Sequence, residues 1–396
     1  MNILLVVLLI SMIFVVPIGE NNPNENINTR PSQVSSVYYE NMNGDVSEFE
    51  STLEVTDISL NINPEIPVYE NTTGYAWGIY VSGDYAYLAD DLSGLAVIDI
   101  SNPMNPGTPV YESLNRIAYC VYVSGDYAYI GCSDRLAVID VSNPTNPGTP
   151  IFEVLTGAAH GVYVSGDYAY LADGSSGLAV IDVSDPTNPG APVYEDTIGS
   201  ATDVYVSGDY AYMSLGSSGL AIINISDPTN PGTPIYKDTT GNALGIYVSG
   251  DYAYLATRNS GLTIISVSDP TNPGTPIYED TTGYPYGVYV SGNYAYLANS
   301  ESGLTNIYSG LIVIDISDPT NPSLPIYEST TGMARDVYVR GNYAYLANSE
   351  YGLAVIQLQK SGGGIPLGNS FLIFIGISVI CLVFIKKRQI VRTSRK

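Results

Sequence analysis

The chain of 396 residues is predicted to be all-β: a seven-bladed β-propeller of four-stranded antiparallel blades, followed by one C-terminal transmembrane helix. Two observations predict the propeller. The string Gly-Asp-Tyr-Ala-Tyr or Gly-Asn-Tyr-Ala-Tyr occurs seven times, at a spacing of about 42 residues that suits four short strands and their turns. Between the repeats, short segments rich in Val, Ile and Tyr alternate with turn sequences and leave no room for a helix.

The unit at residues 158–199 shows how each blade is built. Its strand segments AAHGVYV, YAYLAD, LAVIDVS and APVYEDT are separated by SGD, GSSG and DPTNPG. Glycine before Asp or Asn suits a two-residue hairpin, because such a turn needs a positive φ. The prolines restrict DPTNPG to a turn or a strand edge. The tyrosines of YAYLA face one side of the sheet and Ala169 and Leu171 the other, so we interpret the tyrosine excess as packing between blades.

The ring is expected to close through its N-terminal end. The seventh unit stops at Leu358 without a fourth strand, and residues 53–70 resemble the missing half. An unpaired sheet edge invites aggregation, so we expect the N-terminal strand to complete the last blade. The third-strand pattern occurs twice, as Leu53 to Ser59 and Leu353 to Leu358, and the sequence leaves open which copy joins the sheet.

The N-terminal end predicts export. Residues 1–19 contain an apolar run of the length found in secretory signal peptides. No basic residue precedes this run, so an uncleaved N-terminal anchor stays the alternative. Residues 20–50 are polar and weakly patterned, as in a disordered leader. The propeller is then expected to occupy residues 51–360.

The C-terminal end predicts a membrane anchor. A glycine-rich linker at 361–366 precedes the apolar segment 367–385, which as a helix is long enough to span a bilayer. Residues 386–396 are basic and contain no acid, which places this tail in the cytoplasm. The sequence therefore predicts a single-pass cell-membrane protein with an extracellular propeller.

Charge and cysteine content narrow the function further. The net charge is −25, and an acidic surface of this kind repels nucleic acid, so no nucleic-acid partner is expected. We interpret the acidity itself as a source of solubility. Cys120 and Cys132 lie on the two arms of one predicted hairpin, where either a disulfide or two buried small side chains could result.

The third strand of each unit carries a family resemblance. LAVID at 95–99, 136–140 and 178–182, and LIVID at 311–315, each followed by a turn of the DPTNP type, resemble the LVIVD-repeat family. The resemblance implies a cell-surface propeller and no particular reaction. At the last position Asn224, Ser266 and Gln357 replace the acid in three units, which favours a turn cap over a metal ligand.

Comparison of the seven units with one another separates the scaffold from the variable positions. The SGD and DPTNPG turns scarcely vary and lie at one predicted end of the ring. At the other end, the position two residues before each VYV or IYV changes from unit to unit. If the first strand is innermost, these side chains surround the mouth of the central channel. The candidate ligand-binding residues are Trp77, Tyr119, His160, Thr202, Leu244, Tyr286 and Arg335, with Tyr75 and Tyr284 beside them and Tyr308 in a variable loop.

An aromatic mouth of mixed charge suits a sugar or a peptide, because aromatic side chains offer contact area at low entropy cost. We hypothesise a binding or adhesion module for a carbohydrate or a surface protein, with a passive structural role in the cell envelope as the alternative. Variable rim loops containing Asp91, Arg135, Arg258, Glu301, Glu350 and Tyr351 belong to the same face.

An extracellular glycan hydrolase or lyase is the least favoured hypothesis. The sequence has no nucleophile elbow, CxxC, HExxH or glycine-rich phosphate loop. His160 has no partner that the sequence assigns, and no spacing selects a pair of carboxylates among Asp91, Asp203, Asp336 and Glu301. We therefore predict no catalytic residue, no metal ligand and no cofactor.

Overall fold

The computed structural model describes residues 37–40, 46–49, 67–300 and 308–358. The antiparallel strands β1 (Val37–Glu40) and β2 (Val46–Phe49) belong to a unit separate from the propeller and lie in the stretch expected to be a leader. The expected signal peptide, glycine-rich linker, membrane anchor and basic tail lie outside the described residues. Within those ranges the structure has no helix of the length and apolar character that crossing a bilayer requires.

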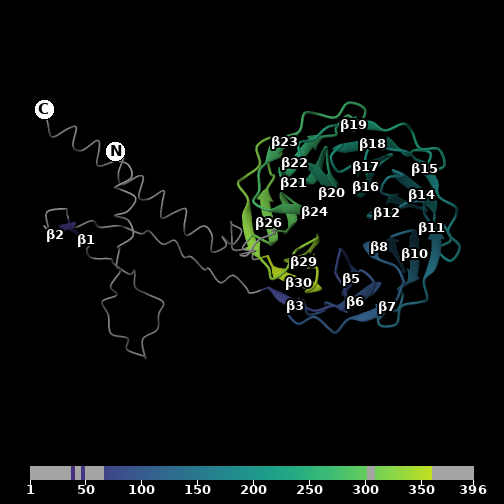
Figure 1. Cartoon of the computed structure of the whole chain (residues 1–396), viewed down its shortest axis with the longest axis horizontal. Coiled ribbons are helices and arrows are strands. Elements are labelled where there is room, and N and C mark those ends of the chain that lie inside the picture. The colour runs from purple at the N-terminus through teal and green to yellow at the C-terminus, as the bar shows by residue number, and fades with distance from the viewer. Residues whose placement is uncertain (1–36, 41–45, 50–66, 301–307, 359–396) are drawn as a thin grey trace. The chain divides into compact units, whose positions relative to one another are not determined.

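Seven four-stranded antiparallel sheets form the propeller (Figure 1). Blade 1 contains β4 (Gly78–Ser82), β5 (Tyr85–Ala89), β6 (Leu95–Asp99) and β7 (Val110–Glu112). Blade 2 contains β8 (Ala118–Ser124), β9 (Tyr127–Cys132), β10 (Arg135–Asp140) and β11 (Ile151–Val154). Blade 3 contains β12 (Gly161–Ser165), β13 (Tyr168–Ala172), β14 (Leu178–Asp182) and β15 (Val193–Glu195).

The remaining blades repeat this order. Blade 4 contains β16 (Asp203–Ser207), β17 (Tyr210–Ser214), β18 (Leu220–Asn224) and β19 (Ile235–Lys237). Blade 5 contains β20 (Asn242–Ser249), β21 (Tyr252–Arg258), β22 (Gly261–Ser266) and β23 (Ile277–Glu279). Blade 6 contains β24 (Tyr284–Ser291), β25 (Tyr294–Ser300), β26 (Gly310–Asp315) and β27 (Ile326–Ser329).

Blade 7 closes the ring as the sequence predicts. Its strands are β28 (Asp336–Arg340), β29 (Tyr343–Ala347), β30 (Leu353–Gln357) and, from the N-terminal side, β3 (Val68–Glu70). In β3, Tyr69 pairs with Ala354 of β30. The C-terminal copy of the third strand therefore joins the sheet, and the earlier copy lies outside the described residues.

The SGD and DPTNPG turns, which repeat from blade to blade, take the expected form and lie at one end of the ring. In blade 1, Ser82 pairs with Tyr85 across a two-residue loop whose first residue, Gly83, has a φ of +52°, as a type II′ turn requires. The N–H of Ile100, just after β6, donates to the carbonyl of Asp84 in that loop (2.8 Å). The carboxylate of Asp99 accepts the N–H of Ser101 (2.8 Å). The acid at the end of the third strand is thus a turn cap.

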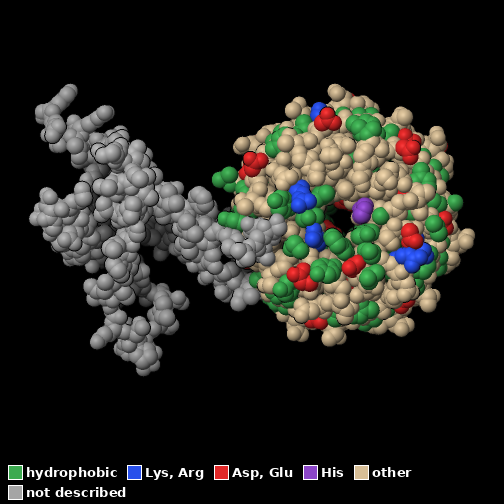
Figure 2. Space-filling model, viewed as in Figure 1, with side chains coloured by type: hydrophobic (Ala, Val, Ile, Leu, Met, Phe, Trp, Pro, Cys, Tyr) green, Lys and Arg blue, Asp and Glu red, His purple; other side chains and the backbone are tan. Residues whose placement is uncertain are grey.

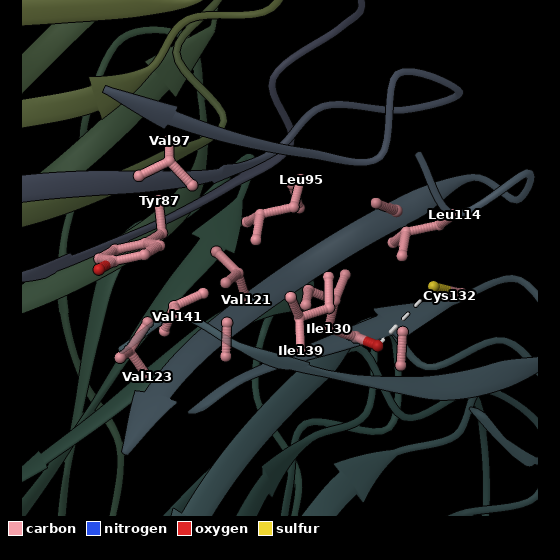
Figure 3. Packing of buried hydrophobic residues seen from close by; sticks show 14 residues of the cluster. Tyr87, Leu95, Val97, Leu114, Val121, Val123, Ile130, Cys132, Ile139 and Val141 are labelled. Carbon is pink, nitrogen blue, oxygen red and sulfur yellow. Dashed lines mark hydrogen bonds between the residues drawn. The ribbon is translucent and has the colours of Figure 1, made fainter. Parts of the chain in front are cut away.

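Packing between blades accounts for the tyrosines of the second strand. Tyr87 and Val97 of blade 1 face Val121 and Ile130 of blade 2 (Figure 3). The second tyrosine of every YAY string is 3–8% exposed, and the seven are Tyr87, Tyr129, Tyr170, Tyr212, Tyr254, Tyr296 and Tyr345. Large side chains on one blade fill the space over small ones on the next, which confirms the interpretation drawn from the sequence.

Tyrosines of the outermost strands add a polar contact at six of the seven blades. The N–H of Thr156, in the segment that enters blade 3, donates to the hydroxyl of Tyr194 in β15 (3.1 Å). The same bond is made by the hydroxyls of Tyr111, Tyr236, Tyr278, Tyr327 and Tyr69. Blade 2 has Phe152 at this position and lacks the hydroxyl.

The two cysteines of blade 2 are free thiols. Cys132 lies opposite Ala118, and Cys120 lies opposite Gly131, because a bulge follows Ala118. No disulfide joins them: Cys132 is buried and Cys120 is partly buried against apolar neighbours, as expected of two small side chains. Both ends of the described propeller lie at the end of the ring that carries the SGD and DPTNPG turns. The N–H of Leu358, just after β30, donates to the carbonyl of Asn342 in a two-residue loop (2.6 Å). Because β3 runs antiparallel to β30, its first residue, Val68, lies opposite Val355 near the same end.

Candidate functional site

The innermost strands carry a closed circle of seven tyrosines, which we call the tyrosine collar. Each member is the central residue of a VYV or IYV string in the first strand of its blade. Ring centroids of neighbouring members are 4.6–5.0 Å apart around the whole circle, which is the spacing of favourable aromatic pairs. The members are Tyr80, Tyr122, Tyr163, Tyr205, Tyr247, Tyr289 and Tyr338.

Burial in the collar favours the neutral form of several of its tyrosines. Burial, reinforced by the neighbouring collar tyrosines, raises the pKa of Tyr80 to about 12. The pKa values of Tyr122, Tyr205 and Tyr289 are raised further for the same reasons. These four side chains are therefore neutral at physiological pH. The tyrosines were expected to pack between blades and this circle was not predicted, although a tyrosine at the same position of every first strand indicates it.

Two residues before the collar tyrosine, on the side of the mouth, blades 4 and 7 have an aspartate, whereas four of the other five blades have a glycine. A Cβ added at Gly161 would lie 2.5 Å from Oδ1 of Asp203. The innermost strands of blades 3 and 4 are therefore so close that only one of them can carry a side chain at this position. Asp203 accepts the N–H of Ile246 in blade 5 (3.0 Å), and Asp336 accepts the N–H of Ile79 in blade 1 (3.0 Å). Each carboxylate thus links its own blade to the next.

These two carboxyl groups are difficult to ionise. Burial raises the pKa of Asp203 to about 7, and the charge of Asp336 adds to the rise, although accepted backbone N–H bonds oppose it. Burial likewise raises the pKa of Asp336 to about 6. Within the described residues, no group of three or more His, Cys, Asp or Glu side chains is placed to hold a metal ion.

At the mouth, five of the predicted residues form a continuous arc, which we call the mouth arc. The guanidinium carbon of Arg335 lies 4.4 Å from the ring centre of Tyr286 and 4.8 Å from that of Trp77. Trp77 is followed by Tyr119, with ring centroids 6.3 Å apart, and Tyr119 by His160 at 4.8 Å. Figure 2 shows this face, with a hollow at its centre bordered by the histidine (purple) and basic side chains (blue).

The other two members of the predicted circle differ in character. The hydroxyl of Thr202 is close to Oγ of Ser214 (2.9 Å) and donates to the carbonyl of Ala243 (3.0 Å), while Oγ of Ser214 donates to the carbonyl of Leu244 (2.7 Å). Thr202 is thus engaged within the scaffold, and the side chain of Leu244 is aliphatic. Blades 4 and 5 therefore interrupt the aromatic arc.

The three flanking tyrosines occupy different places. Tyr75 is 49% exposed. Tyr284 lies beneath the guanidinium of Arg258, whose carbon is 4.6 Å from the ring centre. Tyr308 packs edge-to-face on Tyr327 of β27, with centroids 5.2 Å apart. Because β27 is the outermost strand of its blade, Tyr308 lies on the outer side of blade 6 rather than beside the channel.

The rim loops are held largely by local contacts. Arg135 donates to Asp134 (2.8 Å) and lies 5.1 Å from the ring centre of Phe152. Tyr351 lies against Tyr69 of β3, with centroids 6.4 Å apart. Glu301 lies outside the described residues.

Within the arc, burial lowers the pKa of His160, so its imidazole is neutral at pH 7.

The repeats match a known family. The model of the LVIVD repeat matches seven segments of the chain, at residues 73–108, 115–151, 156–192, 198–235, 240–276, 282–327 and 331–357. None of the curated proteins is similar enough in sequence to match.

Solved structures show the same fold at low sequence identity. The RRP9 WD40 repeats are 10% identical, with a TM-score of 0.59 over 75% of this chain and 100% of that one. The WD40 β-propeller domain of Doa1 is 8% identical, with a TM-score of 0.56 over 75% and 97%. The computationally designed Ika8 protein is 8% identical, with a TM-score of 0.52 over 74% and 99%.

Proposed function

The chain belongs to the LVIVD repeat family, and from this premise and the mouth arc we propose that it is a binding module. In this proposal the propeller is displayed outside the cell, and its channel mouth binds a carbohydrate or a surface protein. Propellers of this kind are typically interaction modules, and fold alone assigns no reaction.

The observation that carries the proposal is the mouth arc itself. Blades 6, 7, 1, 2 and 3 each contribute one side chain, and these side chains contact one another in sequence around the channel. They stand at a position near the mouth end of the innermost strands that varies strongly among the seven units. Aromatic and guanidinium groups are those that anchor ligands in protein binding sites.

The direction of the chain ends supports presentation of the mouth to the surroundings. Leu358, where the described propeller ends, lies beside the loop that contains Asn342, at the end opposite the mouth. A C-terminal anchor at residues 367–385 would therefore follow from the far end of the ring. In the proposed arrangement the membrane lies behind the propeller and the mouth arc faces outward.

A triple substitution of the arc tests the proposal. The full chain and its Trp77→Ala, Tyr119→Ala, Tyr286→Ala variant are compared for binding to polysaccharides and proteins of the cell envelope. A control variant replaces three exposed apolar residues outside the arc, Val154, Ile198 and Leu324, with alanine.

Loss of binding in the arc variant, with binding retained in the control, is the expected result. Equal binding by all three proteins would move the site away from the mouth. Absence of binding by the unaltered chain would favour a passive structural role in the envelope.

A further inference from the structure

The basic residues of the propeller are few, and two of them gather at the mouth without ion pairs. Residues 67–358 contain six Lys and Arg side chains. Arg116, Arg135 and Arg340 each lie within 4.0 Å of an aspartate. In the described part of the chain, neither Arg258 nor Arg335 has an ion-pair partner, and both lie over aromatic rings of the mouth.

The guanidinium of Arg335 is in contact with two aromatic rings, and several of its N–H donors have no acceptor within the described structure. Tyr286 and Trp77 flank the guanidinium, and its Nε donates to Oγ of Ser349 (3.3 Å). Its Nη2 lies 4.0 Å from Sδ of Met333, a weak acceptor. A guanidinium presents five N–H donors in a planar fork that matches a carboxylate, so most of this fork is left for an external acceptor.

The carboxylate nearest in sequence does not neutralise this cation. Asp336 directs one oxygen to the N–H of Ile79 (3.0 Å) and the other to the N–H of Val337 (2.8 Å). Next to the guanidinium, the indole N–H of Trp77 is buried and has no acceptor within the described structure. The mouth therefore holds a guanidinium that has no ion-pair partner among the described residues, in a protein whose net charge is −25.

Two cationic side chains lie among aromatic side chains at the mouth. Arg258 over Tyr284 is followed by Tyr286, Arg335 and Trp77. A chain of sugar acids has the complementary pattern, since each residue carries a ring face that stacks on aromatics and a carboxylate that pairs with a guanidinium. An acidic peptide offers carboxylates on flexible side chains without the flat apolar face.

On this basis, which rests on the proposed function, we propose that the mouth binds an anionic polysaccharide built of uronic acids. Arg335 pairs with a carboxylate of the ligand, Arg258 pairs with a second carboxylate, and the rings of Trp77, Tyr119 and Tyr286 pack against sugar faces. The arginines select the acid over the neutral sugar, while the aromatic rings supply contact that both share.

The test uses an oligogalacturonate and its fully methyl-esterified form, which has the same sugar chain without the charge. Both are titrated against the full chain in detergent micelles. A charge-assisted pair corresponds to roughly tenfold or more in affinity, so we expect the acid to bind at least about tenfold more tightly than the ester. We also expect its affinity to fall as salt is raised.

Substitutions assign the effect to the mouth. Arg335→Gln should weaken binding of the acid about tenfold and leave binding of the ester nearly unchanged. Arg335→Lys retains the charge and should recover part of the affinity, which separates loss of charge from misfolding. Arg116→Gln removes an ion-paired cation of blade 2 and should have no effect.

Three outcomes would overturn the inference in different ways. Equal binding of acid and ester, lost in the triple arc variant, would leave the proposed function standing and refute the anionic ligand. Binding of polyglutamate with loss in Arg335→Gln, without binding of the oligogalacturonate, would indicate an acidic peptide instead. If neither oligosaccharide binds and the arc variant retains all envelope binding, both proposals fail.

Discussion

Ring closure by β3 can be tested by removing one side chain. Tyr69 is half-buried and packs on the apolar cluster between blades 6 and 7, and its hydroxyl accepts the N–H of Thr331 (2.8 Å). Loss of the partly buried ring costs about 2 kcal/mol, and loss of the hydrogen bond adds about 1 kcal/mol. Tyr69→Ala should therefore lower the free energy of unfolding by about 3 kcal/mol.

Tyr194→Ala is the matched control. Tyr194 occupies the same place in blade 3, packs on the cluster between blades 2 and 3, and accepts the N–H of Thr156 (3.1 Å). Its strand is continuous with its own blade, whereas β3 reaches blade 7 from the other end of the chain. If β3 closes the ring, the two substitutions should cost similar amounts.

Denaturant unfolding measures both costs, and hydrogen exchange locates them. Tyr69→Ala should speed exchange of the amides in β30, the strand that pairs with β3, and leave those of β14 unchanged. The opposite pattern is expected for Tyr194→Ala. A cost below about 0.5 kcal/mol for Tyr69→Ala, with the full cost for Tyr194→Ala, would show that β3 does not complete blade 7.

Three further predictions concern stability and reactivity. Phe152→Tyr supplies the hydroxyl that blade 2 lacks and should raise the free energy of unfolding by up to about 1 kcal/mol in denaturant titrations. The pKa of Asp203 is about 7 in the folded protein and about 3.9 when unfolded, so the folded state binds this proton more tightly. The contribution of the protonated carboxyl group to stability is therefore complete below about pH 4 and is lost as pH rises to 7. Unfolding free energy measured across that range should therefore fall by up to about 1.4 kcal/mol per pH unit from this group, and the fall should be smaller in Asp203→Asn; an unchanged slope would contradict the assignment. Burial raises the pKa of Cys132 to about 12 and that of Cys120 well above its usual value, so iodoacetamide should modify neither thiol at pH 8 until the protein unfolds, as mass spectrometry would show.

The repeat made the fold predictable from sequence. Gly83 and its six equivalents mark turns that need a positive φ, and the missing fourth strand of the last unit predicted closure by the N-terminal segment. The choice between the two copies of the third strand was not predictable, because both have the same pattern of apolar residues. The pairing of Tyr69 with Ala354 settles it.

The placement of the candidate residues at one end of the ring could be predicted from the sequence, whereas their contacts could not. Repeat alignment placed Trp77, Tyr119 and Arg335 at one level of the ring because the units share a register. Which neighbours touch depends on rotamers, so neither the enclosure of Arg335 by two rings nor the engagement of Thr202 in the scaffold could be read from the sequence. The packing of Tyr308 on Tyr327 likewise could not be read from the sequence.

The placement of both propeller ends opposite the mouth has a mechanical consequence. In the proposed arrangement, a ligand held at the mouth and a tether leaving after β30 pull in opposite directions along the strands. Backbone hydrogen bonds of a sheet run across the strands, and β30 lies between β29 and β3. Such a force loads both ladders in shear, so their bonds must break together instead of one at a time. A pull on the N-terminal side acts on β3 alone, which is paired along three residues, and the blade should resist tension far better from its C-terminal end.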